Sequence, residues 1–431
     1  MKVIHRKISN VALFSPLYLW LIYSISTILV FEFGPLDFGI KNKTLLYGYL
    51  FFAHVAVIFG YYHGFKKMRG IRQAGFNSTL LNIKLLQRIS FAILCLIAVS
   101  FLRDYVGGVS IEGTSQDAMS GKENYSKNRS GGLLGYLGAF LGVLVIPFLA
   151  AGIVCFNRLN KFSKYMLVLL IVRIIYDAYI GSSRAGLMML IIVAFFSILV
   201  SIYSGQTKFN FKKLLIYFLP ITFLFLAYSS YISVARQTVE IDDMAEYMSS
   251  NLRYDFDKDS LLIPKFEGEF KIINAGILTS YFYFGHAYAG LHDALELPFK
   301  GTTFFFGHSD FTIRNLARVF GDDVLEYSLH RRLVLENKSA GTLWVTAYTA
   351  IASDTTFIGS LAVLYFFGLT LSKNWIKSVF RPTLTSYALS AWMVYFFFQI
   401  NMTFVPADLG AFISFWGAIF LGTFRFRKRT I

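Results

Sequence analysis

Long apolar runs separated by short polar stretches dominate the pattern along the chain. A helix needs roughly 17–25 apolar residues to cross the hydrocarbon core of a bilayer. Only helices and closed barrels satisfy their own backbone groups in lipid, so runs of this length predict membrane-spanning helices. Ten runs approach or reach it, namely Val11–Phe31, Leu45–Tyr62, Ile89–Leu102, Gly132–Phe156, Tyr165–Gly181, Leu187–Tyr203, Leu214–Val234, Asp354–Ser372, Thr383–Met402 and Gly410–Phe424.

The pattern predicts an all-α, polytopic integral membrane protein with about ten transmembrane helices. Helices one to seven occupy residues 1–234, a large outer loop occupies 235–342, and helices eight to ten occupy 343–431. The third and tenth runs are short, and each is expected to continue into its flanks. The first run is too long for a signal-peptide core and lacks a small-residue cleavage pattern, which indicates a retained anchor.

The placement of charge predicts the orientation in the membrane. Alternate loops together contain 22 basic residues and no acidic residue. Cytoplasmic loops carry an excess of Lys and Arg, so these loops and both termini are predicted to be cytoplasmic. The loops are 1–10, 63–88, 157–164, 205–213, 373–382 and 425–431.

The net charge of +16 therefore reflects membrane topology. A nucleic-acid binder would cluster basic and aromatic residues on one soluble face, whereas here the basic residues are divided among short loops. Hydrophobic residues make up 55% of the chain and charged residues 15%, which excludes a soluble globular enzyme and a disordered chain. Cys95 and Cys155 lie inside apolar runs and form no metal motif.

The outer loop has 108 residues, of which 11 are basic and 16 acidic. A loop this long without secondary structure is uncommon in a compact protein, so it is expected to contain helices. Leu278–Leu295 is predicted to be one, because Tyr281, Gly285, Tyr288 and His292 fall on one face at helical spacing. The functional domain is expected to be this loop, which we predict to be periplasmic and packed against the mouth of the bundle.

Charged residues inside a membrane usually mark function. Arg173 and Asp177 are four residues apart in the fifth predicted helix, and the favoured interpretation is a self-neutralised pair that stabilises the bundle. The sequence Gly-Ser-Ser-Arg-Ala-Gly at 181–186 is different, because it places Arg184 among small residues where the next helix begins. A helix N-terminus beside an arginine is suited to phosphate or pyrophosphate. The alternative for Arg184 is a side chain that snorkels to the interface.

Further arginines lie on the predicted outer side. Arg236 follows the seventh run directly, Arg314 and Arg318 form an i,i+4 pair, and Arg331 and Arg332 follow His330. The planar guanidinium group binds phosphate oxygens two at a time, which favours an anionic ligand. Each arginine taken alone is better explained by a salt bridge to one of the local acids.

Four histidines, His286, His292, His308 and His330, lie in the outer loop. Histidine is a natural general base near neutral pH, although a lone histidine is more often structural. No zinc-binding spacing is present.

The acidic stretch at 255–259 lacks the glycine and the bidentate glutamate of a calcium loop, so we expect no metal site. Among the aromatic residues, Tyr281, Tyr288 and Trp344 are candidates to stack against sugar rings.

Three features together resemble the O-antigen polymerases, with a more distant likeness to O-antigen ligases. These features are ten spans with one large loop late in the chain, the small-Ser-Arg-small turn at 181–186, and the stretch Thr346-Ala-Tyr-Thr followed by Asp354-Thr-Thr-Phe-Ile-Gly359. The chain departs from the family where an Asn or His usually precedes the acidic position, since Leu343-Trp-Val stands there. It also departs at the usual Asp-Phe-Gly, which here reads Asp354-Thr-Thr.

The resemblance implies a membrane glycosyltransferase that polymerises undecaprenyl-pyrophosphate-linked oligosaccharide repeat units into surface polysaccharide. It implies no cofactor and no metal, a bacterial inner membrane location, and a possible chain-length regulator as partner. The residues predicted to act in catalysis are Arg184, Arg236, Asp354 and His330. Those predicted to bind substrate are Arg314, Arg318, Arg331, Arg332, His308, Tyr281, Tyr288 and Tyr348.

Two other functions stay open at this point. The chain is also compatible with an O-antigen ligase, which belongs to the same enzyme class. A flippase or secondary transporter is the alternative from another class, but carriers usually show inverted repeats and broken helices near the membrane midplane. No repeat is visible here, and the polar chemistry gathers on one predicted face.

Overall fold

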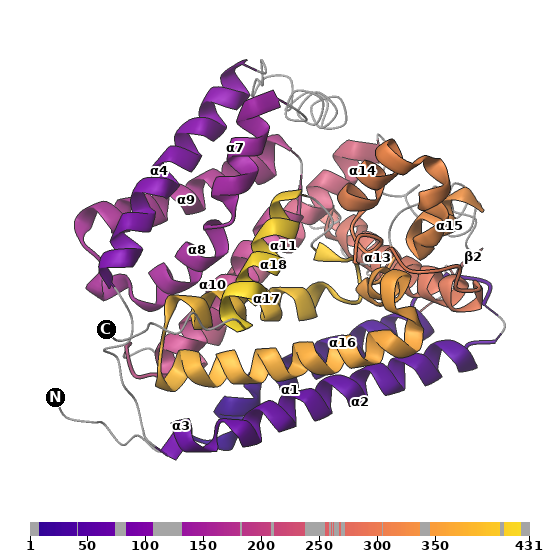
Figure 1. Cartoon of the computed structure of the whole chain (residues 1–431), viewed down its shortest axis with the longest axis horizontal. Coiled ribbons are helices and arrows are strands. Elements are labelled where there is room, and N and C mark those ends of the chain that lie inside the picture. The colour runs from indigo at the N-terminus through magenta and orange to yellow at the C-terminus, as the bar shows by residue number, and fades with distance from the viewer. Residues whose placement is uncertain are drawn as a thin grey trace.

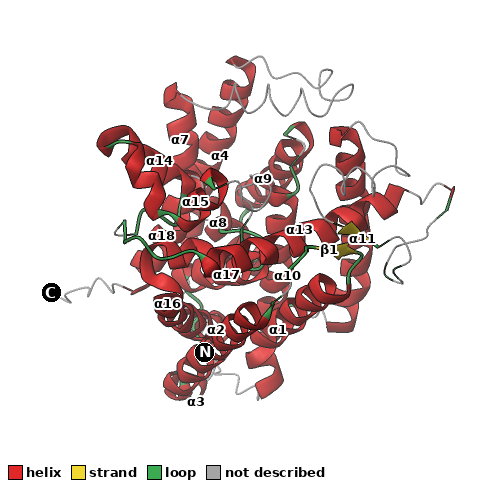
Figure 2. Ribbon diagram, turned by 90° about the vertical axis from the view of Figure 1, so that its right-hand side faces the viewer, coloured by secondary structure: helices red, strands yellow, loops and turns green. Residues whose placement is uncertain are grey.

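The structure is a computed structural model, and it is built almost entirely of α-helices. It describes residues 8–40, 42–73, 83–106, 132–181, 183–207, 211–237, 255–257, 260, 262, 267–268, 272–303, 305–336, 345–405 and 409–423. The exception to the helices in this part of the chain is a pair of two-residue strands. β1 (Leu36–Asp37) and β2 (Asp255–Phe256) pair antiparallel and are drawn in yellow in Figure 2.

Seven stretches of helix among the described residues are long and apolar enough to cross a membrane. They confirm the membrane-protein class that the apolar runs predicted. The stretches are α1 (Asn10–Phe33), α2 (Thr44–Lys67), α4 (Ile83–Val106), α7 with α8 (Gly132–Gly142 and Val145–Val154), α10 (Ala185–Tyr203), α11 (Phe211–Gln237) and α16 (Ala347–Phe380).

The other three predicted spans are also helices, but they are shorter or more charged. α17 (Leu384–Gln399) and α18 (Leu409–Thr423) have 16 and 15 residues, fewer than a straight span needs. α9 (Lys161–Ile180) carries both Arg173 and Asp177 within its apolar length. The count of about ten transmembrane helices therefore stays a prediction.

The segment predicted to be an outer loop contains helices, as its length suggested. α13 (Ile272–Glu296) includes the whole predicted helix at 278–295, which confirms that prediction. α13 packs against α11 and α1, and Figure 1 shows it with the next two helices at one side of the molecule. The shorter elements are α14 (Asp310–Phe320), α15 (Leu329–Leu335), α3 (Arg69–Gln73) and the 3-10 turns Phe156–Arg158 and Asp322–Tyr327.

α2 and α16 lie side by side along most of their length (Figure 1). Glycines make this close approach possible. A Cβ atom at Gly60 would lie 2.0 Å from the backbone oxygen of Tyr365, and one at Gly368 would lie 2.4 Å from the backbone oxygen of Val57. Small residues at such interfaces allow the backbones of membrane helices to pack directly.

A buried network of hydrogen bonds joins α1, α13 and α16 to the chain after α17. The amide of Asn401 donates to Ser24 Oγ at 3.0 Å and to Thr27 Oγ1 at 3.1 Å, and its oxygen accepts from the Tyr348 hydroxyl at 3.3 Å. The Tyr288 hydroxyl lies 2.9 Å from Thr27 Oγ1. Polar side chains that bond across helices fix their register in an apolar bundle.

Charged residues join α4 to α9. Arg173 forms ion pairs with Asp177 at 2.7 Å, as predicted, and with Asp104, which the sequence pattern did not single out. Arg103 lies 3.4 Å from the same Asp104 carboxylate. Arg173 and Asp104 are both buried, and a buried charge is stable only where it is paired.

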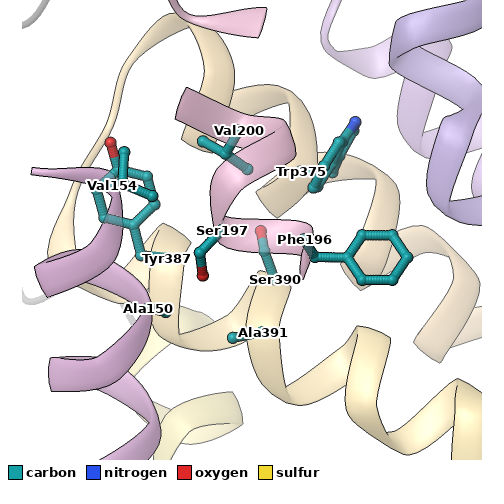
Figure 3. A pocket seen from close by; sticks show the side chains of 9 residues that line it. All are labelled: Ala150, Val154, Phe196, Ser197, Val200, Trp375, Tyr387, Ser390 and Ala391. Carbon is teal, nitrogen blue, oxygen red and sulfur yellow. The ribbon is translucent and has the colours of Figure 1, made fainter. Parts of the chain in front are cut away.

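A small apolar pocket lies between α8, α10, α16 and α17, and Phe196, Val200, Trp375 and Tyr387 line it (Figure 3). None of the nine lining residues is charged. None of the residues predicted to act in catalysis or substrate binding contributes to it. The pocket is therefore a packing feature of the bundle, and the predicted site residues lie outside it.

Candidate functional site

Asp354 lies in the first turns of α16, where Thr303, Gly307 and His308 surround its carboxylate. One carboxylate oxygen accepts from Thr303 N at 3.2 Å, from the Thr303 hydroxyl and from Gly307 N at 3.3 Å. The other accepts from His308 N at 3.1 Å and lies 3.0 Å from His308 Nδ1. A buried carboxylate with this many donors is held in its charged form and in one orientation.

His308 is fixed at both ring nitrogens. Its Nδ1 faces Asp354, and its Nε2 accepts a hydrogen bond of 3.1 Å from the indole Nε1 of Trp416 in α18. These partners select the tautomer that carries its proton on Nδ1. Phe404 and Phe412 also pack around the ring, with centroids 5.2 and 5.7 Å away. Asp354 and His308 therefore connect the segment predicted to be the outer loop to α16 and α18.

The backbone around this carboxylate is strained. Among the described residues, Phe305 (φ 73°) and Thr356 (φ 66°) are the non-glycine residues with positive φ. Phe305 lies between the donors Thr303 and Gly307, and Thr356 breaks α16 two residues after Asp354. Such a conformation costs about 1–3 kcal/mol and is often found at functional sites. Both outliers flank one carboxylate, which makes this the leading candidate site.

His330, a predicted catalytic residue, lies next to this arrangement. The Ser328 hydroxyl donates to Gly307 O at 2.9 Å, so it accepts the hydrogen bond from His330 Nδ1 at 2.9 Å. The other ring nitrogen lies 3.9 Å from Asp310 Oδ1. Burial, with a smaller contribution from His308, lowers the pKa of His330 from 6.5 to about 4. His330 is therefore neutral at pH 7.

Asp310, at the start of α14, gathers two of the predicted arginines. Its carboxylate forms ion pairs with Arg331 and, at 2.9 Å, with Arg314. The Arg314 side chain is 55% exposed, so it can reach a ligand from solvent, whereas the Arg331 side chain is largely covered. The structure thus brings together five predicted site residues, which are Asp354, His308, His330, Arg331 and Arg314.

The second arginines of α14 and α15, Arg318 and Arg332, have different surroundings. Arg332 is buried, donates to Pro298 O at 2.6 Å and pairs with Glu336 at 3.2 Å. It therefore ties α15 to the chain that follows α13. Arg318 is exposed on α14 and donates to Asn315 at 3.2 Å. Their predicted roles in substrate binding stay predictions.

Arg184 lies where the sequence placed it, immediately before the first residue of α10. The turn is closed by a hydrogen bond of 2.8 Å from Ser183 N to Ala178 O, at the end of α9. The guanidinium group of Arg184 lies 5.3 Å from the ring centroid of Tyr283 in α13. A helix N-terminus and a cation on an aromatic ring therefore share one turn, which is suited to an anionic group.

The other predicted residues lie apart from the Asp354 carboxylate in their contacts. Arg236 lies in the last turn of α11, and its side chain is outside the described residues. Tyr281 donates to Leu262 O at 2.9 Å. Tyr288 and Tyr348 are fully buried in the network around Asn401, so sugar stacking by either ring would require the bundle to open.

Sequence reasoning missed Asp310, Thr303 and Trp416 at this site. Asp310 stands four residues before Arg314, and that spacing was a signal for an ion pair. Thr303 and Trp416 are 51 and 108 residues from their partners, and no local pattern marks either. Among the described residues, no group of three His, Cys, Asp or Glu side chains is placed to hold a metal ion.

The fold and this site define a class: a helical protein of the membrane type with a polar site between residues 303–336 and the helices α16 and α18. Comparison with known proteins adds no narrower assignment. No protein-family model matches the chain, no curated protein matches it significantly, and no solved structure does.

Proposed function

We propose that the chain is a membrane glycosyltransferase that polymerises lipid-linked oligosaccharide repeat units, as in the O-antigen polymerases. The observation that carries the proposal is the position of Arg184 at the N-terminus of α10, beside Tyr283. A helix N-terminus that follows directly on an arginine is suited to the pyrophosphate of a lipid carrier. The acidic and basic side chains around Asp354 supply the second set of groups that such a reaction needs.

In this reaction the bond between the donor sugar and the pyrophosphate breaks, and the acceptor hydroxyl forms the new glycosidic bond. The leaving pyrophosphate gains charge, which Arg184 is proposed to stabilise together with Arg236. The hydroxyl proton passes to a base in the outer segment. His330 is a weak base at neutral pH because its pKa is about 4, and the unprotonated Nε2 of His308 already accepts a hydrogen bond from Trp416. A carboxylate such as Asp310, whose side chain is partly exposed, is therefore the better candidate.

The proposed location is the bacterial inner membrane, with both termini in the cytoplasm and the Asp354 site on the periplasmic side. The donor would be an undecaprenyl-pyrophosphate-linked oligosaccharide, and a chain-length regulator is a possible partner. No nucleotide sugar is needed on that side, because the lipid-linked unit already carries the activated sugar. This orientation is supported by the alternate loops that contain basic residues and no acidic residue, which are predicted to be cytoplasmic.

The test is incubation of the purified chain with lipid-linked repeat units, followed by separation of the products by length. We expect a ladder of polymers with the unaltered protein and none with Arg184→Ala, because the leaving group loses its stabilising charge. Arg184→Lys should retain a small part of the activity, since it keeps the charge but not the planar fork. Arg158→Ala, at an exposed position in a loop predicted to be cytoplasmic, is the matched control.

A normal ladder from Arg184→Ala would refute the pyrophosphate role. In cells, loss of a polymerase leaves surface lipid that carries a single repeat unit, whereas loss of a ligase leaves lipid-linked polymer. A flippase defect produces neither product. The surface lipid and lipid-linked glycans of a strain that lacks this gene therefore distinguish the three candidate functions.

A further inference from the structure

Two basic segments that are far apart in the sequence meet at one end of the helical bundle. α2 has Lys66 and Lys67 in its last turn, α3 follows it directly, and Lys373 lies in the last turns of α16. α3 packs against both α2 and α16 (Figure 1). Neither of the two segments, 63–88 and 373–382, contains an acidic residue. The fold therefore concentrates positive charge that the sequence divides between two loops.

α2 and α16 run parallel, and their packing determines where the two segments meet. The Tyr49 hydroxyl lies 2.7 Å from Ser360 Oγ, and later on both helices a Cβ atom at Gly64 would lie 2.9 Å from Ser372 Cβ. The backbones are still in close contact at this point, because the same Cβ atom would lie 2.8 Å from the backbone oxygen of Leu369. The residues that follow on the two helices are therefore held side by side.

These residues form a cation cluster, which consists of Lys67, Arg69, Arg72 and Lys373. Lys67 and Lys373 are close enough for their charges to repel each other. Burial, and less strongly the charge of Arg69, lowers the pKa of Arg72. Among the described residues, none of the four forms an ion pair. Like charges that are held together without a counterion destabilise each other, so the cluster favours an anionic ligand.

Arg72 is already oriented at this junction. Its guanidinium carbon lies 3.7 Å from the ring centroid of Phe65, and this contact restricts the plane of the group. Its Nε atom is buried and has no hydrogen-bond partner in the described part of the chain. A partly desolvated charge is stabilised by an opposite charge beside it. Phosphate suits the position, because a guanidinium group binds phosphate oxygens two at a time.

Exposed aromatic side chains adjoin the cation cluster toward the middle of the two helices. Phe366 stands seven residues before Lys373, which places it two helical turns away on the same face of α16. Its side chain is 59% exposed, and that of Phe59 in α2 is 64% exposed. Cations near the end of a membrane helix and apolar side chains nearer its middle match the order of head group and acyl chain in a phospholipid.

We propose that the cation cluster binds the head group of a phospholipid that carries two phosphates, of the cardiolipin type, with its acyl chains along Phe59 and Phe366. One phosphate neutralises the pair of lysines and the other neutralises the pair of arginines. Basic clusters between membrane helices on the cytoplasmic side are suited to such head groups. Both segments are predicted to be cytoplasmic, so the lipid comes from the inner leaflet. The inference is independent of the proposed function.

The test titrates the full chain in detergent with cardiolipin, phosphatidylglycerol or inorganic diphosphate, and native mass spectrometry counts the bound molecules. Cardiolipin should bind at least about fivefold more tightly than phosphatidylglycerol, because its second phosphate meets further cations. Lys67→Gln with Lys373→Gln should weaken cardiolipin binding roughly 25-fold, at about fivefold for each cation removed. Arg158→Gln with Lys161→Gln is the matched control, because it removes two exposed charges from another loop predicted to be cytoplasmic, and it should leave binding nearly unchanged.

Thermal unfolding supplies a second measurement. Without lipid, the loss of like charges in Lys67→Gln with Lys373→Gln should leave the Tm unchanged or higher. Cardiolipin should raise the Tm of the unaltered chain and not that of this variant. Lys67→Arg with Lys373→Arg keeps both charges and should retain binding. If the glutamine variant does not fold, Arg69→Gln, at an exposed position in α3, replaces it and should weaken binding about fivefold.

Three results would overturn the inference. An equal loss of cardiolipin binding in the two double glutamine variants would indicate general attraction to a basic face. Equal affinity for phosphatidylglycerol and cardiolipin would mean that the chain does not recognise a head group with two phosphates. Displacement of cardiolipin by an equal concentration of inorganic diphosphate would identify a site for a free anion.

Discussion

At the level of single residues, the Asp354 site shows what a sequence can and cannot reveal. Asp354 is predicted from the family resemblance, and His308 and His330 are predicted because histidine is a natural general base near neutral pH. The proximity of Asp354 and His308 rests partly on backbone N–H donors to Asp354, at Gly307 and His308. A backbone donor leaves no mark in the pattern of residue types. The strained φ of Phe305 and Thr356 is likewise invisible before the structure is known.

The charge of Asp354 should hold the outer segment against α16. Asp354→Asn keeps the size of the side chain but removes the charge and turns one acceptor into a donor that faces N–H groups. We expect the free energy of unfolding to fall by about 3–5 kcal/mol, the usual loss when one partner of a buried pair is removed. Denaturant titration in detergent measures it. Asp323→Asn, exposed in the turn after α14, should change it by less than about 0.5 kcal/mol.

Protonation of His330 should destabilise the folded chain in acid. The pKa of His330 is about 4 in the folded chain and 6.5 unfolded, so between these values the unfolded chain binds more protons. Stability is therefore highest above pH 6.5 and falls, by up to about 1.4 kcal/mol per pH unit from this group, as the pH drops toward 4.

Unfolding measured at a series of pH values, with His330→Gln beside the unaltered chain, tests this expectation. The variant cannot gain the proton, so its stability should fall less steeply between pH 6.5 and 4. Groups facing His330, namely Asp310, His308, Asp354 and Arg314, are present in both proteins and serve as an internal control. If stability falls equally steeply with pH in His330→Gln and in the unaltered chain, burial does not lower the pKa of His330 as stated.

At the level of elements, the apolar runs located the helices better than their ends. α4 begins six residues before its run, because Lys84 and Arg88 are compatible with a helix whose flanks leave the lipid. α16 begins seven residues before the predicted run, which starts at Asp354, and residues 347–353 are all buried inside the protein. The break between α7 and α8 lies in an unbroken apolar run, and the residue that marks it is Pro147 in the first turn of α8, because proline has no N–H group to continue a helix.

The glycine contacts between α2 and α16 predict a steric effect. Gly60→Ala places a methyl group 2.0 Å from the backbone oxygen of Tyr365, which side-chain rotation cannot relieve. We expect a loss of about 1–3 kcal/mol or more, since the two helices must separate. Gly48→Ala is a matched control in the same helix, because its methyl group would meet nothing within 4 Å and should raise helix propensity. Thermal unfolding of both variants gives the comparison.

At the scale of the whole molecule, composition was sufficient for the membrane class, while the arrangement of the helices was not accessible from it. Seven apolar helices bear out the class. Contacts such as Asn401 with Ser24 join residues 377 positions apart, and local periodicity carries no information on them. The orientation across the membrane rests on charge placement alone, and it is directly testable.

Reporter fusions test the orientation. A reporter active only after export, fused within residues 245–260, should be active, and one active only in the cytoplasm should be inactive there. Fusions after Arg381 should give the reverse pattern, because that loop is among those with basic and no acidic residues. If the cytoplasmic reporter is active within residues 245–260 and the exported reporter is active after Arg381, the topology is the reverse of the predicted one and the Asp354 site lies in the cytoplasm.

The hydrogen bond from Trp416 to His308 also constrains the order of biosynthesis. Trp416 is made 108 residues after His308, which at about 5–20 residues per second is a delay of roughly 5–20 s on the ribosome. Until α18 has been inserted, the imidazole lacks its indole partner and the aromatic rings of Phe412 and Trp416. The nascent chain therefore completes this site last, and a protein truncated before α18 should be made, inserted and inactive.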